Sequence, residues 1–270
     1  MKQIFLRSQN TIFIFDSGLG GITIYNYIKS IFLNINFIYL LDNKYFPYGN
    51  KSKNFILQRL KKILKKISNY YNITLAVIAC NTASVSSLPI IRNYFNFPII
   101  GVTPVIDLAI KQTKNNVIGF LATNTTLKNF KIRKKINFLN KKYKIKTISS
   151  SKLVFLAEKK LLGYKIKINE IKKIFKSWDN FKIFPDTIIL GCTHFPLILN
   201  ELKTIFPKNI YFLDSKKSII LKFKKYLNYN QINVKKKENV VLYTEKSKYI
   251  KQIEFLFLKK GFKKISSFKI

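Results

Sequence analysis

The sequence predicts an α/β protein with two similar domains, each built on a central, mainly parallel sheet flanked by helices. Short, continuous apolar runs recur along the 270 residues, as in parallel strands that are buried on both faces. Longer Lys-rich stretches with apolar residues at helical spacing separate these runs. The chain is long enough for one large or two medium domains.

The predicted strands all end at small or polar residues. They are residues 11–15 before Asp16, 37–41 before Asp42, 75–79 before Cys80, 117–121 before Ala122 and 187–190 before Gly191. Residues 55–67 and 168–175 are predicted helices between them. Because ligands bind beyond the carboxyl ends of parallel strands, we expect these strand ends to form the functional site.

A faint internal repeat supports two similar domains. Residues 77–82 (VIACNT) and 189–194 (ILGCTH) each contain an apolar run, a small residue, a cysteine and then hydrogen-bonding side chains. The two copies lie about one domain length apart. We therefore expect two domains that face one another and carry one cysteine each.

The chain is strongly basic, with 50 Lys and Arg against 12 Asp and Glu and a formal net charge of +38. Such a charge favours polyanions. However, Arg7, Arg59, Arg92 and Arg133 are the only arginines, and the lysines are spread along the whole chain. We interpret the charge as a composition bias carried on solvated faces, and we expect no specific nucleic-acid partner.

Neither a membrane span nor a metal site is expected. No segment reaches the roughly 18–20 apolar residues of a span, and the apolar patch in residues 1–10 is too short for a signal sequence. We expect a cytoplasmic protein with reduced thiols. Two cysteines and one histidine argue against a multi-ligand metal site and a disulfide scaffold.

The two cysteines are candidates for acid/base chemistry. A buried cysteine is usually a small hydrophobe, but Cys80 and Cys192 both follow strands and precede hydrogen-bonding residues. A thiol with an ordinary pKa of about 8.5 is only slightly ionised at neutral pH. A helix N-terminus after each strand would raise the thiolate fraction. Two such thiols could remove a proton from one face of a carbon acid and return one to the other.

Six motifs in order carry a resemblance to a known family. They are residues 15–21 (FDSGLGG), Asp42 with 46–51 (FPYGNK), 79–83 (ACNTA), 101–104 (GVTP), 119–123 (GFLAT) and 191–196 (GCTHFP). With these motifs, the sequence resembles the glutamate racemases of the aspartate/glutamate racemase superfamily over about residues 11 to 215.

The resemblance implies racemisation of L-glutamate to D-glutamate without a cofactor or metal, which supplies peptidoglycan synthesis. Cys80 would act on the D face and Cys192 on the L face of the substrate. Asp16 would assist Cys80, and His194 would assist Cys192. Glu158 matches a family glutamate near the second cysteine.

The family's substrate contacts fall on the strand-end motifs. They match Asp16, Ser17, Tyr48, Gly49, Asn81, Thr82, Thr193 and His194. The side chains among them that donate hydrogen bonds suit a substrate with two carboxylates.

The resemblance also implies the domain division. Residues 1–101 plus 211–270 would form the first domain, with Asp16 and Cys80. Residues 102–210 would form the second, with Cys192 and His194, and the active site would lie in the cleft between the domains. A homodimer is one open possibility. Where the family usually has Cys-Pro, this chain has Ser150-Ser151, and we expect local repacking there.

The same residues allow other interpretations. In the alternative interpretation of Asp16, its side chain caps the next helix. In that of His194, the ring is an ordinary hydrogen-bonded histidine. The glycines of residues 18–21 do not match either phosphate-loop pattern. An aspartate racemase with the same thiol pair and a shorter pocket is the first alternative function. A non-catalytic polyanion-binding protein is a remote one.

Overall fold

The computed structural model describes residues 11–33, 35–178, 182–226 and 239–270. The prediction that residues 1–10 hold no signal sequence therefore lies outside the described residues. Within the described ranges, no helix is both long and apolar enough to cross a membrane.

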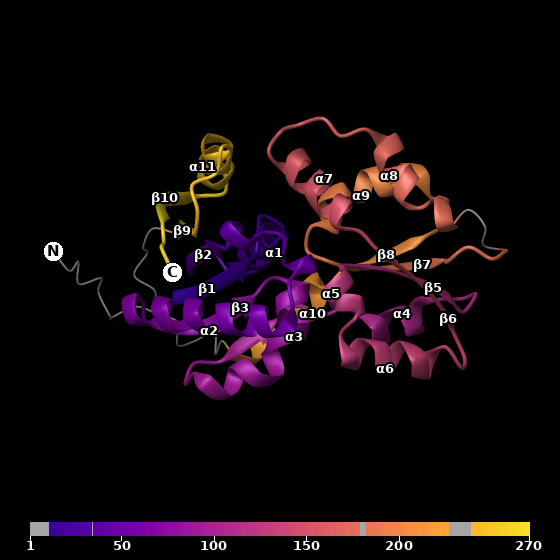
Figure 1. Ribbon diagram of the computed structural model, residues 1–270, viewed down its shortest axis with the longest axis horizontal. Coiled ribbons are helices and arrows are strands. Elements are labelled where there is room, and N and C mark those ends of the chain that lie inside the picture. The colour runs from indigo at the N-terminus through magenta and orange to yellow at the C-terminus, as the bar shows by residue number, and fades with distance from the viewer. Residues whose placement is uncertain (1–10, 34, 179–181, 227–238) are drawn as a thin grey trace.

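The described chain forms two sheets with parallel strand pairing. The first has six strands in the order β10-β9-β2-β1-β3-β4, and the second has four in the order β6-β5-β7-β8. Every strand pair given for the described residues is parallel. Helices flank both sheets, and Figure 1 shows the two halves side by side along the long axis. The predicted α/β class with two parallel sheets flanked by helices is confirmed.

The five predicted strands and the two predicted helices are all present. The first half contains β1 (Thr11–Asp16), β2 (Asn36–Leu41), β3 (Ile73–Ile78), β4 (Ile99–Gly101), β9 (Asn239–Tyr243) and β10 (Phe262–Ser267). Its helices are α1 (Ile22–Ile31), α2 (Lys53–Tyr70), α3 (Asn81–Ile91), α10 (Lys216–Tyr226) and α11 (Ile250–Lys259).

The second half contains β5 (Val117–Ala122), β6 (Lys144–Ser149), β7 (Thr187–Gly191) and β8 (Tyr211–Leu213). Its helices are α4 (Ile106–Gln112), α5 (Asn124–Leu127), α6 (Phe130–Leu139), α7 (Ser151–Leu161), α8 (Ile168–Ile174) and α9 (Leu199–Ile205). Short 3-10 helices are Asn43–Tyr45, Tyr48–Asn50, Arg92–Tyr94, Lys176–Trp178 and Phe195–Ile198.

Strand order explains where the site lies. β1 pairs with β2 on one side and β3 on the other, and β5 pairs likewise with β6 and β7. The winding direction reverses at each of these positions, and ligands bind beyond the carboxyl strand ends at such reversals. Cys80 follows β3 and Cys192 follows β7, so each half brings one cysteine to its reversal point.

The C-terminal segment completes the first sheet. β9 pairs with β2, and β10 pairs with β9. β8, however, pairs with β7 in the second sheet. The sequence division placed residues 211–213 in the first domain, and this pairing moves them to the second sheet.

Helix α2 shows how a Lys-rich segment folds. The Ser52 side chain accepts a hydrogen bond from Phe55 N and caps the helix. One face buries Ile56, Leu60, Ile63, Leu64 and Ile67, which belong to one apolar cluster with residues of β1 and β3. The lysines occupy the other positions, as expected for an amphipathic surface helix.

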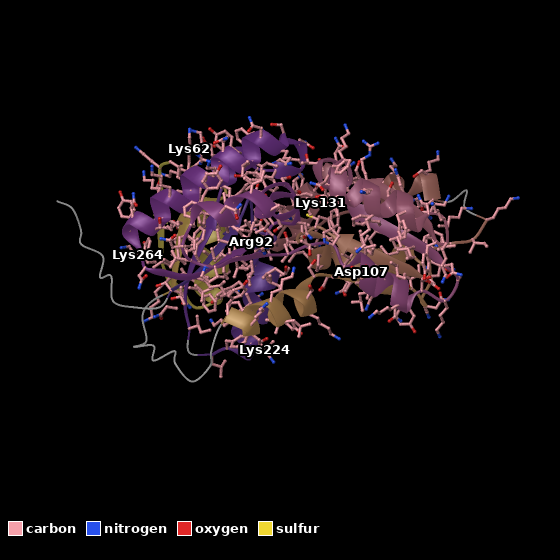
Figure 2. All side chains as sticks on the ribbon, turned by 90° about the horizontal axis from the view of Figure 1, so that it is seen from below. Lys62, Arg92, Asp107, Lys131, Lys224 and Lys264 are labelled. Atoms are coloured by element: carbon pink, nitrogen blue, oxygen red, sulfur yellow. The ribbon has the colours of Figure 1, made fainter. Side chains whose placement is uncertain are left out.

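Charged side chains cover both halves of the molecule. In Figure 2, Lys62 on α2, Lys224 on α10 and Lys264 on β10 lie over the first half, and Lys131 on α6 lies over the second. This distribution fits our interpretation of the charge as decoration of solvated faces.

Candidate active site

Asp16 joins the two halves at the end of β1. Its carboxylate accepts hydrogen bonds from Gly18 N at 3.3 Å and Ser17 Oγ at 3.3 Å. It also accepts one from Thr193 Oγ1, beyond the end of β7, at 3.0 Å. Asp16 does not cap the next helix, because the N-cap of α1 is Gly21 and has no side-chain hydrogen bond. The alternative interpretation of Asp16 as a cap is wrong.

Burial changes the acidity of Asp16. The side chain is fully buried, and desolvation raises its pKa to about 6. The nearby charge of His194 and the hydrogen bonds from Gly18 and Thr193 oppose this rise without cancelling it. Asp16 therefore titrates close to neutral pH, as a proton carrier should.

Cys80 is held as a thiol. It is the N-cap residue of α3, is 6% exposed, and its Sγ lies 3.8 Å from Ser17 Oγ. Burial raises its pKa well above the ordinary value, and the charge of Asp16 raises it further. A hydrogen bond from Ala83 N lowers the pKa, but by less. The expectation that the helix N-terminus would raise the thiolate fraction is therefore wrong for Cys80, because desolvation dominates.

His194 stands beside Cys192, with 3.7 Å between Nδ1 and Sγ. Burial lowers the pKa of His194, but its hydrogen bonds to Cys192 and Glu158 outweigh burial and hold that pKa well above its usual value. Cys192 is 7% exposed and is followed by a short 3-10 helix at Phe195–Ile198. The α-helix expected immediately after this cysteine is absent.

The His194 ring has hydrogen-bond partners in two protonation states. Its Nε2 lies 3.1 Å from Glu158 Oε1 and 3.2 Å from Gly20 N. A protonated ring donates Nε2–H to Glu158, whereas a neutral ring with its proton on Nδ1 accepts from Gly20 N. This arrangement suits a group that changes charge during a reaction.

Glu158 connects α7 to the loop after β1. Its Oε1 accepts a hydrogen bond from Leu19 N at 2.6 Å in addition to contacting His194. The structure therefore places Glu158 next to His194 and, through it, next to Cys192. Sequence position alone gave little support for this placement, because residues 128–180 diverge from the family pattern.

Two glycines of the β1 loop allow this close approach. A Cβ on Gly18 would collide with Glu158 Oε1 and lie 2.7 Å from the Phe46 ring. A Cβ on Gly20 would collide with the His194 ring, 2.7 Å from Cε1. The glycine-rich loop therefore makes room for side chains of the second half.

We expect Gly20→Ala to push the His194 ring away from Cys192. A displacement of about 1 Å at a reacting group lowers turnover by roughly 10²-fold. Steady-state kinetics measures this loss. His194 is the one histidine of the chain, so its single ring NMR signal reports the altered environment. Unchanged kinetics and an unchanged signal would contradict the assigned contact.

The remaining predicted contacts lie on the first half. Asn81 Nδ2 donates to Ser215 Oγ at 3.5 Å, and Thr82 Oγ1 lies 2.8 Å from Thr123 Oγ1. Gly49 approaches the Thr123 side chain closely. Thr123 follows β5, so it brings the second half against α3. Sequence reasoning did not select it, although it ends the 119–123 motif.

Tyr48 belongs to a buried hydrogen-bond network centred on Asp42. Its hydroxyl donates to Asp42 Oδ2 at 2.6 Å, and Arg59 bonds the same carboxylate at 3.0 and 2.8 Å. Thr244 Oγ1 donates to Asp42 Oδ1 at 2.7 Å. Tyr48 therefore fixes the segment before Gly49, and its hydroxyl is already committed. Sequence analysis named Asp42 and Tyr48 but did not predict their partners Arg59 and Thr244.

Ser150 and Ser151 each make a specific hydrogen bond. Ser150 caps α7 by accepting from Leu153 N at 3.1 Å. Ser151 Oγ donates to Asn50 Oδ1 at 2.8 Å. The departure from the family's Cys-Pro pair thus creates a capped helix start in contact with the first half.

The assembled site contains two thiols, each with its own ionisable neighbour. Cys192 is close enough to Cys80 for its charge to raise the pKa of Cys80. Asp16 is linked to Cys80 through Ser17, and His194 lies between Cys192 and Glu158. Among the described residues, no group of three His, Cys, Asp or Glu side chains is placed to hold a metal ion.

Comparison with known proteins shows which family the chain belongs to. No protein-family model matches the chain. The curated glutamate racemase of Buchnera aphidicola subsp. Schizaphis graminum is 45% identical over 252 residues, covering 93% of this chain and 97% of that protein. The curated glutamate racemase of Pectobacterium atrosepticum is 43% identical and covers 78% and 74%, respectively.

A solved structure agrees with these relatives. The Escherichia coli glutamate racemase, crystallised with L-glutamate and the activator UDP-MurNAc-Ala, matches with a TM-score of 0.90 and 34% identity. The match covers 97% of this chain and 98% of that one. With the six motifs in order, the fold and close relatives over nearly its whole length, this chain belongs to the glutamate racemase family.

Proposed function

We propose that this chain interconverts L- and D-glutamate without a cofactor, with Cys80 and Cys192 as the two acid/base groups. In the cytoplasm this reaction would supply D-glutamate for peptidoglycan. One observation carries the proposal: two buried cysteines follow equivalent strands of two sheets, and each has its own ionisable partner. The proposal holds for a monomer or a homodimer.

In the L-to-D direction, Cys192 acts as the base. As a thiolate beside the protonated His194, it takes the α-proton, so the Cα–H bond breaks and an S–H bond forms. The electron pair stays on Cα. The Cys80 thiol, kept protonated by burial, gives its proton to the opposite face and leaves D-glutamate.

In the D-to-L direction, Cys80 must first lose its proton. Asp16 lies within reach through Ser17, whose Oγ contacts both Asp16 Oδ1 at 3.3 Å and Cys80 Sγ at 3.8 Å. An ionised Asp16 accepts the proton, and the resulting thiolate removes the α-proton of D-glutamate. Cys192 then returns a proton to the other face.

Hydrogen-bond donors around the thiols suit the two carboxylates of glutamate. Ser17, Asn81, Thr82 and Thr193 all lie at carboxyl strand ends and are almost fully buried. The N-terminal turn of α3 adds backbone N–H groups. Donors fixed in a dry site stabilise the charge that develops as the α-proton leaves.

The direct test follows the optical rotation of glutamate with purified protein and no added cofactor. We expect the circular dichroism signals of L- and D-glutamate both to decay to zero, while aspartate keeps its signal. Decay with aspartate would favour the sister racemase. A signal that persists from either glutamate enantiomer would contradict the proposal, and steeply salt-dependent polyanion binding without turnover would favour the binding protein.

Asp16 sets the acid limb of the pH profile. Its ionised form accepts the Cys80 proton, so kcat/KM for D-glutamate should rise as pH increases through about 6. A fall at higher pH should follow, because the partner thiol must stay protonated, and the profile is bell-shaped. In Asp16→Asn the rate should be low and the limb near pH 6 absent. If Asp16→Asn kept the limb near pH 6, that limb would belong to another titrating group.

The same shift affects stability. The folded-state pKa of Asp16 lies above its ordinary value of 3.8, so folding favours the protonated form. This contribution is complete below pH about 3.8 and is lost as pH rises through about 6. In Asp16→Asn, this pH-dependent loss of stability should be absent. Urea unfolding of both proteins at pH 4 and pH 7 measures the difference in the free energy of unfolding.

A further inference from the structure

Lys160 binds two groups of the segment that follows His194. Its Nζ donates to the Leu197 carbonyl oxygen at 3.0 Å and pairs with Glu201 Oε2 at 2.7 Å. The side chains of Lys160 and Glu201 are 32% and 17% exposed. The chain has 12 acidic residues against 50 basic ones, so few lysines can have a carboxylate of their own. Composition bias therefore does not explain a half-buried lysine that holds both a carbonyl and a carboxylate.

The two elements that Lys160 joins also carry Glu158 and His194. Lys160 lies two residues after Glu158 in α7. Leu197 lies in the 3-10 helix at Phe195–Ile198, and its N–H donates to the His194 carbonyl oxygen at 3.0 Å. Because each element is a continuous hydrogen-bonded segment, a shift of Lys160 relative to Leu197 would also shift Glu158 relative to His194.

Apolar packing holds α7 near this segment without fixing its exact position. Leu156 and Ala157 of α7 belong to the same buried cluster as Phe195 and Ile198. Hydrophobic contact is non-directional, whereas a hydrogen bond weakens steeply as its distance and angle change. The directional bonds of Lys160 can therefore set the register that the apolar cluster leaves free.

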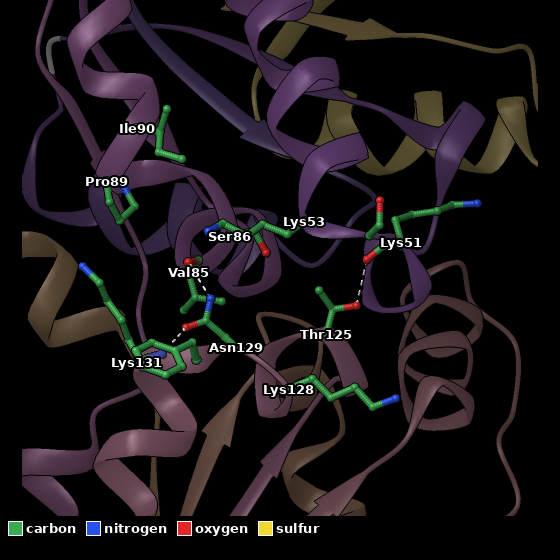
Figure 3. Close-up of a pocket in the computed structure, with 12 residues that line it drawn as sticks. Lys51, Lys53, Val85, Ser86, Pro89, Ile90, Thr125, Lys128, Asn129 and Lys131 are labelled. Atoms are coloured by element: carbon green, nitrogen blue, oxygen red, sulfur yellow. Dashed lines mark hydrogen bonds between the residues drawn. The ribbon is translucent and has the colours of Figure 1, made fainter.

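Hydrogen bonds elsewhere between the two halves restrain other helices. Figure 3 shows Thr125 of α5 bonded to the Lys51 carbonyl oxygen at 3.0 Å, and Asn129, the N-cap of α6, bonded to the Val85 carbonyl oxygen at 2.9 Å. Neither bond involves α7. Glu158 itself bonds the first half, so the side chain that contacts His194 also carries part of the contact between the halves. Its position therefore benefits from a separate support.

We propose that Lys160 is a positioning residue for the racemase site, which holds the turn after His194 against α7 so that Glu158 stays within hydrogen-bond distance of the His194 ring. A carboxylate at that distance stabilises the protonated ring, and a protonated histidine stabilises a neighbouring thiolate. Lys160 thus supports Cys192 as a base by acting through two other side chains. The inference rests on the proposed function, because it concerns the Cys192 half of the two-base reaction.

The test measures each half of the reaction separately in Lys160→Met, which keeps an unbranched side chain without the charge. The probes are the two enantiomers of a glutamate analogue whose β-leaving group departs after α-proton removal. Elimination from the L-form, with Cys192 as the base, should fall about tenfold. Elimination from the D-form, with Cys80 as the base, should change less than twofold. Equal losses with both forms, or no loss with the L-form, would overturn the proposal.

The wild-type assay separates this inference from the proposed function. A wild-type protein that does not racemise glutamate would contradict the proposed function, and this inference with it. An active wild type whose Lys160→Met variant fails the comparison above would contradict only the role of Lys160.

The His194 ring gives a second readout. It is the one histidine of the chain, and the charged or titratable groups that act on it are Cys192, Glu158 and Asp16. A looser contact with Glu158 should lower the pKa of His194 in Lys160→Met, whereas loss of the lysine charge alone would raise it. An NMR titration of the ring signal distinguishes the two. An unchanged or raised pKa would overturn the proposal.

Two further variants control for charge and for general structure. Lys159 lies next to Lys160 on α7 but is exposed and has no ion pair with any described residue. Lys159→Met should therefore leave both elimination rates within twofold of the wild type. Lys160→Arg keeps a cation with N–H donors and should restore the L-form rate to within about threefold of the wild type. Equal losses in Lys159→Met and Lys160→Met, or no recovery in Lys160→Arg, would contradict a positioning role.

Discussion

Replacing Cys80 or Cys192 by serine is expected to abolish racemisation in both directions. Serine preserves the shape of each side chain but is a far weaker acid and base than cysteine. Each turnover uses both faces of the substrate, so either variant should lose about 10³-fold or more in kcat. Circular dichroism of both glutamate enantiomers measures this loss, and far-UV spectra show that the variants fold.

A partial reaction distinguishes the two variants. A substrate analogue whose β-leaving group departs after α-proton removal needs only one base. The Cys192→Ser variant should still process the D-form of the analogue, with Cys80 as the base. The Cys80→Ser variant should still process the L-form, with Cys192 as the base. If one cysteine were merely structural, its variant would retain nearly full racemisation.

Isotope exchange gives a second check on the wild-type enzyme. With two bases, product formed in deuterated water acquires deuterium early while recovered substrate keeps its α-proton. One base that served both faces would label substrate and product alike.

Among substitutions of residues other than the two cysteines, Asp42→Ala should cause the largest decrease in the free energy of unfolding. Asp42 is fully buried, and its partner Arg59 is 7% exposed. Removing the carboxylate leaves the guanidinium charge buried and deprives Tyr48 and Thr244 of their acceptor. Breaking a buried pair in this way costs about 3–5 kcal/mol. Urea unfolding measures the change.

A surface ion pair provides the matched control. Asp107 is 78% exposed and pairs with Lys135, so Asp107→Ala should change stability by less than about 1 kcal/mol. Asp42→Ala should also raise KM for glutamate, because Tyr48 no longer fixes the segment that leads to Gly49. Equal stability of the two variants would show that the Asp42 network contributes little.

The pattern of apolar residues in the sequence was sufficient to predict the main strands of both sheets. Strands such as β1, β3 and β7 are buried on both faces, so their uninterrupted apolar runs identify them without further information. The strands missed by the pattern are short or interrupted by lysine, such as β6 and β10. Their positions depend on pairing with distant strands, which local periodicity does not encode.

The sequence by itself determined the α/β class, the two parallel sheets and the chemical identity of the groups at the strand ends, because burial and topology leave a direct mark on residue pattern. Only the tertiary structure decided how those groups ionise. Burial raises the pKa of Cys80 against the helix N-terminus that should lower it, and Glu158 meets His194 only because Gly18 and Gly20 let the halves approach. Such effects depend on distances and solvent exclusion between residues far apart in the chain, which spacing along the sequence does not contain.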